Sequence, residues 1–358
     1  METIQAIGMM SGTSLDGLDM AACQFTNNDG KWAYQILKAE TISYPPKIEA
    51  QLRKVTELSG LDLHLLDVQL GEYMGKSVAE FIDKNQLKPT LVASHGHTVF
   101  HQPENRLTLQ IGNGFSIYNA VRVPVVNDFR SLDLQFGGQG APLVPIGDEL
   151  LFGDYGACLN LGGIANVSFD AGGKRIAFDI TAVNMVLNHL AERLGFSYDE
   201  KGAIAKSGKL VPDLLEKLEK LPYYQVAPPK STGFEMVYTD IIPLLEPTYR
   251  TEDLLHTYTI HAAAKVATAV NEFLPAGSKI LMTGGGAYND FLITQIKQSD
   301  SQNLQWYRPE DDLIQFKEAL VFAFLGVLRW YNKTNILRSV TGSLHDHTGG
   351  IVINNSFK

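Results

Sequence analysis

The stretch IGMMSGTSLDG, from Ile7 to Gly17, begins as an apolar strand and ends in glycine, hydroxyl and carboxyl groups. Glycine lets a backbone approach a ligand closely, and the hydroxyls of Thr13 and Ser14 can donate hydrogen bonds to anionic oxygens together with consecutive backbone N–H groups. The stretch therefore fits a phosphate-binding loop. Asp16-Gly17 between two apolar segments is also a strong signal for a tight β-hairpin, and the two interpretations are compatible.

The composition excludes several classes of protein. The 358 residues, 45% of them hydrophobic, suffice for two domains with separate cores. A net charge of -9 argues against binding to nucleic acid or an anionic membrane, because either partner requires a basic face. Cys23 and Cys158 lack metal-ligand or disulfide spacing, which predicts two buried thiols in a reducing compartment.

We expect a cytoplasmic protein with no membrane span. The first residues lack the basic start and the cleavage site of a signal peptide. The longest apolar run, ALVFAFLGVL at 319–328, is far shorter than the ~20 residues needed to cross a bilayer, and a buried helix explains it better.

The chain starts the same structural plan twice. Alternating apolar residues predict strands at Ile4–Met9, Leu18–Phe25 and Tyr34–Thr41, helices within 46–59 and 63–85, and a short strand from Leu91 that enters a polar turn. GACLNLGGIANVSFD at 156–170 repeats the first pattern of strand, glycine turn and strand, with Gly162, Gly163 and Asn166 in the polar part. Two such hairpins predict two related α/β domains that face each other across a cleft.

A third glycine cluster follows a short strand in KILMTGGGAYND at 279–290. Ligands of open α/β sheets bind at the carboxyl ends of strands, and three residues without Cβ would leave a flat ledge for a nucleobase or ribose. The alternative is a plain loop between a strand and a helix. The cluster is neither a Walker A loop nor a G-x-G-x-x-G fingerprint.

Two glycine hairpins and a strand-GGG-helix segment resemble the actin, Hsp70 and sugar-kinase superfamily, and MSGTSLDGLD at 10–19 resembles its anhydro-N-acetylmuramic acid kinases. The resemblance continues in order through nearly the whole chain: SHGHT (94–98), TLQIGN (108–113), VVNDFR (125–130), GGQGAPLVP (137–145), LNLGGIANV (159–167), FD (178–179), PPKSTGFE (228–235), TGGGAYN (283–289), EALVFAFLGV (318–327) and SVTG (339–342).

This resemblance implies an α/β fold of two related actin-like ATPase domains, of the ribonuclease H-like type, flanking a cleft for ATP and substrate. We expect the N-terminal domain at 1–135 plus about 336–358 and the C-terminal domain at 136–335. The family's activity is a kinase reaction in which ATP and water open the 1,6-anhydro ring of anhydro-N-acetylmuramic acid. The product, N-acetylmuramic acid 6-phosphate, enters cell-wall recycling.

The resemblance also assigns residues to the nucleotide and its metal. ATP contacts are expected at Gly12, Thr13, Ser14, Leu15, Asp16, Gly17, Leu18, Asp19, Gly162, Gly163, Asn166, Gly284, Gly285, Gly286 and Asn289. ATP requires Mg²⁺, which is usually held by one or two carboxylates together with the phosphates, and Asp16 is the candidate.

The family's general base, an aspartate in the FD segment, corresponds to Asp179. It would activate the water that attacks the anomeric carbon while the sugar's O6 is freed to attack the γ-phosphate. From the residues alone, an aspartate at the end of a strand is more commonly the N-cap of the next helix.

Sugar contacts are expected from His95, Asp128, Arg130, Gln139, Lys230 and Glu318. Arg130 could bind a carboxylate of the sugar bidentately, or form an ion pair with Asp128 that braces the loop. Lys230 could reach a phosphate or lie in solvent. Glu318 could bind the sugar or favour a helix N-terminus by its charge. His95 and His97 share a face if extended, but without a further ligand nearby they do not predict a zinc site.

Three departures from the family concern the substrate. The usual T-G-P-G between the catalytic aspartate and the next asparagine is replaced by residues 180–183, His97 stands where glutamine is usual, and Asp148 replaces a histidine. They leave room for another 1,6-anhydro sugar as substrate, and a non-catalytic ATP-gated binding module is the third hypothesis. The oligomeric state stays open, a homodimer included.

Overall fold

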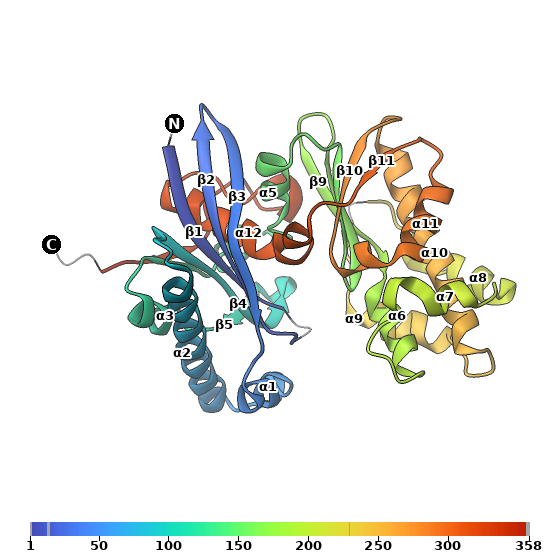
Figure 1. Ribbon diagram of the computed structural model, residues 1–358, viewed down its shortest axis with the longest axis horizontal. Coiled ribbons are helices and arrows are strands. Elements are labelled where there is room, and N and C mark those ends of the chain that lie inside the picture. Colours follow the sequence, from blue (N-terminus) through green and yellow to red (C-terminus); the bar gives the residue numbers. More distant parts are fainter. Residues whose placement is uncertain (1, 13–14, 229, 356–358) are drawn as a thin grey trace. The chain divides into compact units, whose positions relative to one another are not determined.

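The computed structural model describes residues 2–12, 15–228 and 230–355, which form two compact units. The first unit is discontinuous and comprises Met1–Leu151 and Phe316–Lys358, and the second is Phe152–Gln315. These boundaries lie 16 residues after and about 20 residues before those expected from the sequence, at 135 and about 336. Each unit has its own sheet and its own core (Figure 1).

The sheet of the first unit has the order β12-β6-β4-β1-β2-β3, and β5 pairs with β4. Its strands are β1 (Glu2–Ser11), β2 (Leu18–Asn28), β3 (Lys31–Ile42), β4 (Leu91–Gln102), β5 (Leu107–Ile111), β6 (Val125–Asn127) and β12 (Ile351–Ile353). The first three strands form an antiparallel meander, and β4 lies parallel to both β1 and β6. The strands expected at the start of the chain are confirmed.

The sheet of the second unit repeats this plan with the order β11-β10-β7-β8-β9. Its strands are β7 (Ala157–Leu161), β8 (Ile164–Asp170), β9 (Arg175–Ala182), β10 (Lys279–Thr283) and β11 (Gln305–Tyr307). Again three strands form an antiparallel meander, and the next two add in parallel beside the first. The shared order and strand directions confirm two related α/β domains of the expected ribonuclease H-like type.

Helices cover the sheets in both units. Those of the first unit are α1 (Pro46–Leu52), α2 (Gly60–Asn85), α3 (Gly114–Val121), α4 (Ser131–Gln135), α5 (Pro145–Leu151) and α13 (Arg338–Thr341). Those of the second are α6 (Asn184–Glu192), α7 (Ala203–Ser207), α8 (Pro212–Glu219), α9 (Phe234–Met236), α10 (Thr251–Phe273) and α11 (Asp290–Ser299). Helix α12 (Asp311–Trp330) crosses the boundary at a break in its backbone at Phe316. None of these helices, within the described residues, has the length and apolarity that a bilayer crossing requires.

Two local expectations were wrong. The chain does not turn after Leu91, because β4 runs on to Gln102 through a register shift beside β1. The first hairpin is not a two-residue Asp-Gly turn either. Ser11 pairs with Leu18, so six residues, 12–17, separate the two strands, and of these 13 and 14 lie outside the described residues.

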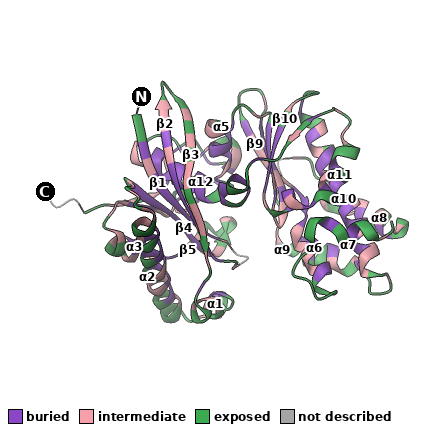
Figure 2. Ribbon diagram, viewed as in Figure 1, coloured by how far each residue is buried: buried purple, intermediate pink, exposed green. Residues whose placement is uncertain are grey.

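The core of the first unit packs against both faces of its sheet. Leu66, Leu70 and Met74 of α2 are fully buried among apolar residues of β1 and β2. On the other face, α12 lies so close to β1 that a Cβ on Gly8 would meet the backbone of Ala319. In Figure 2 the buried residues follow the strands of both units and α12.

Replacement Gly8→Ala should therefore destabilise the protein, by about 1–3 kcal/mol or more, because a methyl group there can be accommodated only if α12 moves away from β1. Urea unfolding measures the change. Gly60→Ala is the matched control, since a Cβ at this helical position meets nothing within 4 Å. It should be neutral or stabilising by up to about 1 kcal/mol. Equal effects of both substitutions would contradict the packing argument.

Candidate functional site

Two described residues between β1 and β2 have backbone conformations that few residue types adopt. Leu15 has a φ of 60° and its N–H donates to the carbonyl of Gly12 at 3.3 Å. Gly17 has a φ of 149°, and a Cβ there would meet the carbonyl oxygen of Ile42 at 2.7 Å. Thr13 and Ser14, which carry the expected hydroxyl contacts, lie outside the described residues. The glycine at 17 is thus required by the fold, while Gly12 is half-buried and Asp16 is exposed.

A buried hydrogen-bonded chain supports the base of this loop. The Tyr44 hydroxyl donates to Ser11 Oγ at 2.6 Å, and Ser11 Oγ lies 2.9 Å from His97 Nδ1. Burial lowers the pKa of His97 to about 4, so the imidazole is neutral and Nδ1 can accept the Ser11 proton. The register shift in β4 turns His97 toward Ser11, and the same-face arrangement of His95 and His97 is not formed.

His95 instead orients Arg130. Its Nδ1 donates to the carbonyl of Gly96 at 2.9 Å, which leaves Nε2 to accept from Arg130 Nε and Nη2 at 3.0 and 2.8 Å. Burial, and then the charge of Arg130, lower the pKa of His95, which is consistent with this neutral acceptor. Arg130 Nη1 donates to the carbonyl of Gly140 at 2.6 Å. Part of the guanidinium's five N–H donors remains for a ligand.

The ion pair considered between Asp128 and Arg130 is not among the contacts of the described residues. Asp128, with a φ of 52°, accepts the N–H of Ser131 at 3.1 Å. Burial lowers the pKa of Arg130 to about 10, and the charges of Glu318 and Asp133 oppose this shift. Arg130 therefore faces acidic groups other than Asp128.

Glu318 lies in the first turn of the helical segment that follows the backbone break at Phe316, within α12 as a whole, which begins at Asp311. It retains access to solvent, yet the protein around it removes enough water to raise its pKa, against the opposing charge of Arg130. Gln139 is also exposed, and its backbone N–H donates to the carbonyl of Thr341 at 2.8 Å.

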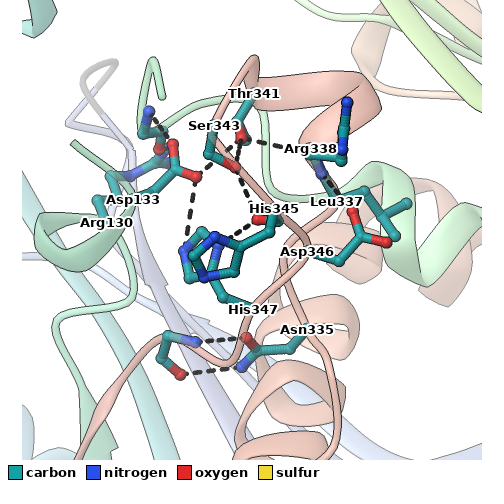
Figure 3. A network of polar contacts seen from close by, with 12 residues as sticks. Arg130, Asp133, Asn335, Leu337, Arg338, Thr341, Ser343, His345, Asp346 and His347 are labelled. Atoms are coloured by element: carbon teal, nitrogen blue, oxygen red, sulfur yellow. Dashed lines mark hydrogen bonds and ion pairs between the residues drawn. The ribbon is translucent and has the colours of Figure 1, made fainter. Parts of the chain in front are cut away.

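Asp133 anchors the glycine loop at 137–140 (Figure 3). Its fully buried carboxylate accepts the N–H of Gly140 at 2.6 Å and the hydroxyl of Thr341 at 2.8 Å, and lies 3.5 Å from His347 Nε2. Gly140 in turn accepts from Arg130. The GGQG and SVTG motifs, 200 residues apart, thus meet at one carboxylate behind Arg130.

Asp148, the third departure noted in the sequence, forms a buried ion pair with Lys317 at 2.7 Å. Lys317 directly precedes Glu318 and follows the break in α12 at Phe316. A histidine at 148 could not provide the same full negative charge to Lys317. An aspartate in place of histidine at 148 therefore changes the charge next to Lys317, the residue that precedes Glu318.

In the second unit, two of the predicted glycine clusters meet. The turn at Gly162 and Gly163 joins β7 to β8, and its carbonyls accept the N–H groups of residues 183–185 at the start of α6. Asn184 Nδ2 donates to the carbonyl of Leu161 at 3.1 Å. A Cβ on Gly286 would meet Leu161, and one on Gly285 would have only Asn184 Nδ2 nearby, at 3.5 Å.

Only one of the three consecutive glycines is therefore free to serve a ligand. Gly284, with a φ of 80°, and Gly286 pack against β7, whereas Gly285 is exposed and open. A 3₁₀ turn (Gly285–Tyr288) follows, and then α11, whose N-cap is Asn289. Because Asn289 Oδ1 accepts the N–H of Leu292 at 2.9 Å, its amide oxygen has a structural partner.

Asp179 lies inside β9 and not at its end. The N-cap of α6 is Val183, so the structure excludes the capping role for Asp179. Asp179 Oδ2 accepts the N–H of Thr232 at 3.0 Å. Burial raises the pKa of the carboxyl, and the Thr232 N–H opposes this shift. Asn166, on the neighbouring strand, pairs directly with Asp179, so the two side chains share a face of the sheet.

The Lys230 side chain is not simply solvated. Its Nζ donates to the carbonyl of Tyr223 at 3.0 Å and lies 4.4 Å above the centre of the Tyr223 ring. Burial, and then the charge of Lys265, lower its pKa. A pocket of about 280 Å³ lies beside Lys230 and Lys265, on the face of β9 that carries Phe178 and Ile180.

The described residues contain no cluster of three or more His, Cys, Asp or Glu side chains arranged to hold a metal ion. A Mg²⁺ ion that arrives with nucleotide needs fewer protein ligands. Burial raises the pKa of Asp19, the Thr41 hydroxyl opposes the shift, and the charge of Asp16 adds to it. Asp16 and Asp19 thus repel each other, and a divalent cation would relieve that repulsion. These two residues fit the expected ion.

Sequence reasoning missed the residues that hold the candidate side chains. Thr232 and Thr341 were within motifs already quoted, KSTG and SVTG, and small hydroxyl residues next to glycine were a usable signal. Tyr223, Asp133 and Tyr44 carry no local signal, because each contacts a residue far away in the chain, at separations of 44, 208 and 33 residues respectively.

The family model and the related sequences cover nearly the whole chain. The family model described as anhydro-N-acetylmuramic acid kinase matches residues 4–355. The proteins of that name from Francisella tularensis subsp. novicida and Nitrosomonas europaea are 34% and 31% identical, over 94% and 97% of this chain and 95% and 98% of theirs. Among solved structures, component A of (R)-2-hydroxyglutaryl-CoA dehydratase from Acidaminococcus fermentans is 14% identical, with 89% and 96% of the chains covered and a TM-score of 0.45.

The burial of Asp179 predicts a pH-dependent cost in stability. Because its pKa is raised in the folded state, folding favours the protonated form, and stability falls as the pH rises from about 4 through the folded pKa. Asp179→Asn lacks this loss. The free energy of unfolding of the variant minus that of wild type, measured in urea, should therefore be larger at pH 7 than at pH 4, which means that the variant gains relative stability as the pH rises. A difference that stays constant would contradict the desolvation of this carboxyl.

Proposed function

The chain belongs to the anhydro-N-acetylmuramic acid kinase family, and on that premise we propose that it opens the 1,6-anhydro ring of anhydro-N-acetylmuramic acid and phosphorylates O6. It is a phosphotransferase that acts on a sugar hydroxyl. The proposed reaction consumes ATP and water and yields N-acetylmuramic acid 6-phosphate and ADP. The observation that carries the ring-opening step is a half-buried carboxylate, Asp179, that caps no helix.

Asp179 acts as the general base. It takes a proton from the water that attacks C1, the bond between C1 and O6 breaks, and the electron pair left on O6 attacks the γ-phosphate, which releases ADP. The N–H of Thr232 holds Oδ2, so Oδ1 is the oxygen available to the water. The raised pKa strengthens the base, and a positioned base contributes about 10²–10⁴-fold in rate.

Arg130 presents its remaining donors to the sugar or its carboxylate, held by His95 and Gly140. Asp128, Gln139 and Glu318 are the other sugar contacts proposed in the first unit. A guanidinium fixed at two edges loses little conformational entropy when it binds a carboxylate.

The nucleotide is bound by the three glycine segments. The loop at 12–17 and the turn at Gly162 and Gly163 take the phosphates, and the open Gly285 supports the nucleoside. When bound, Mg²⁺ neutralises phosphate charge, and Asp16 and Asp19 would hold it.

A kinase of another 1,6-anhydro sugar is the second candidate. The observation that favours it is the Asp148–Lys317 pair, which changes the support of Glu318 relative to the family pattern. Turnover of anhydro-N-acetylmuramic acid compared with levoglucosan distinguishes the two. We further propose a cytoplasmic enzyme of peptidoglycan recycling that binds no nucleic acid, and a homodimer is the oligomeric state to test.

Asp179→Asn should keep the shape of the site and lose the base. We expect nearly normal KM values for ATP and sugar and a kcat lower by ~10²-fold or more, because the proton is transferred in the transition state. Steady-state kinetics with wild type as reference measure this change. In ¹⁸O-labelled water the label should enter the sugar at C1. Wild-type turnover by the variant, or label in the phosphate, would remove Asp179 from the mechanism.

Gly285→Leu tests the nucleoside ledge. The position is exposed, without positive φ and without close neighbours, so the free energy of unfolding should change by no more than about 0.5 kcal/mol. The side chain would occupy the proposed nucleoside space, and we expect ATP affinity in calorimetry to fall at least tenfold, about 1.4 kcal/mol. Gly60→Leu, at an exposed glycine without positive φ and without neighbours within 4 Å, is the control for a general effect. Unchanged affinity at 285 would place the nucleoside elsewhere.

A further inference from the structure

Asp179, Tyr223 and Lys230 of the second unit are joined in a closed ring of hydrogen bonds. The Tyr223 hydroxyl donates to the carbonyl of Asp179 at 2.7 Å. Lys230 Nζ donates to the carbonyl of Tyr223 at 3.0 Å. The N–H of Asp179 donates to the carbonyl of Lys230 at 3.0 Å. Each residue is thus bonded to both of the others, and both backbone polar groups of Asp179 are used.

The ring also places the group that holds the carboxylate. Thr232 lies two residues after Lys230, and its N–H donates to Asp179 Oδ2 at 3.0 Å. The peptide segment around Lys230 therefore contacts Asp179 at its backbone and at its side chain. If this segment moved away from β9, the carboxylate would lose its orienting donor.

The contacts of Lys230 favour a supporting role over a phosphate contact. Its ammonium group lies 4.4 Å above the Tyr223 ring and 5.9 Å from the centre of the Tyr224 ring, so aromatic faces and a carbonyl surround it. Burial raises the pKa of the Tyr223 hydroxyl, which therefore stays protonated and remains a donor.

We propose that Tyr223 and Lys230 are positioning residues. They hold the segment that ends at Thr232, and this segment fixes the Asp179 carboxylate in the orientation needed for proton transfer. This inference rests on the proposed function of Asp179 as the base. It extends that function by naming residues that touch neither the water nor the sugar.

The experiment compares Tyr223→Phe, Lys230→Met and the double variant. Each single variant should lower kcat by about 10- to 100-fold with little change in the KM for ATP and sugar, because it displaces the base without removing a ligand contact. The double variant should lose no more than about the larger single effect, since both residues act in one ring. Tyr307→Phe and Lys220→Met, at exposed positions of the same unit, are the matched controls.

Two readouts separate positioning from a general loss of stability. The Thr232 N–H holds the pKa of Asp179 down, so loosening the ring should raise that pKa and shift the acidic limb of the kcat/KM profile to higher pH. Exchange of the Asp179 and Thr232 amide hydrogens should accelerate by about tenfold. The exchange measurement requires no substrate, and it remains informative if one of the variants is too unstable for kinetics.

The results also separate this inference from the proposed function. If exchange accelerates but neither these variants nor Asp179→Asn lose kcat, the ring exists and Asp179 is not the base. If Asp179→Asn is inactive while Tyr223→Phe and Lys230→Met keep the wild-type kcat, acidic limb and exchange rates, the positioning role is overturned. A raised KM for sugar in Lys230→Met with unchanged kcat would overturn it too, and would make Lys230 a direct sugar contact.

Discussion

The first unit depends on the close approach of α12 to the sheet. Gly8 has no Cβ, so the backbone of Ala319 packs directly against β1, and Gly326 allows the same helix to approach Ala93 of β4. Backbone contact of this kind leaves no space for adjustment, because neither partner can change a rotamer. The positions of Lys317 and Glu318 at the start of this packed segment follow from it.

Several polar residues of the first unit form one hydrogen-bonded network beside this sheet. Asp133, Gly140, Arg130 and His95 form one continuous series of hydrogen bonds, in which each donor meets an acceptor of fixed orientation. The neutral His95 is essential to this arrangement, since a protonated imidazole could not accept from Arg130. Burial thus selects the protonation state, and that state orients the guanidinium.

Local patterns predicted the elements and the repetition of the fold, because glycine turns and alternating apolar residues act over a few residues. The strands on either side of residues 12–17, the turn at 162–163 and the buried helix at 319–328 were all evident from the sequence. The register shift that turns His97 toward Ser11 was not, because it arises between strands about 86 residues apart. The helical residues from Asp311 to the break at Phe316 were missed, because the apolar run that marks the helix in the sequence starts only at Ala319.

Asp179 shows why a site can be only partly predicted from sequence. The residue type and its motif suggested either a helix cap or a general base. An aspartate can serve in both roles, and only the surrounding structure distinguishes them. Its environment combines desolvation, which raises the pKa and strengthens the base, with one backbone N–H, which opposes that rise and orients the carboxylate. A carboxyl with desolvation alone would be protonated at higher pH, and one with several N–H donors would be too weak a base. The segment from Tyr223 to Thr232 supplies a single N–H to the carboxylate and binds the Asp179 backbone at two further points, so it can set the orientation of the carboxyl group without lowering its basicity further.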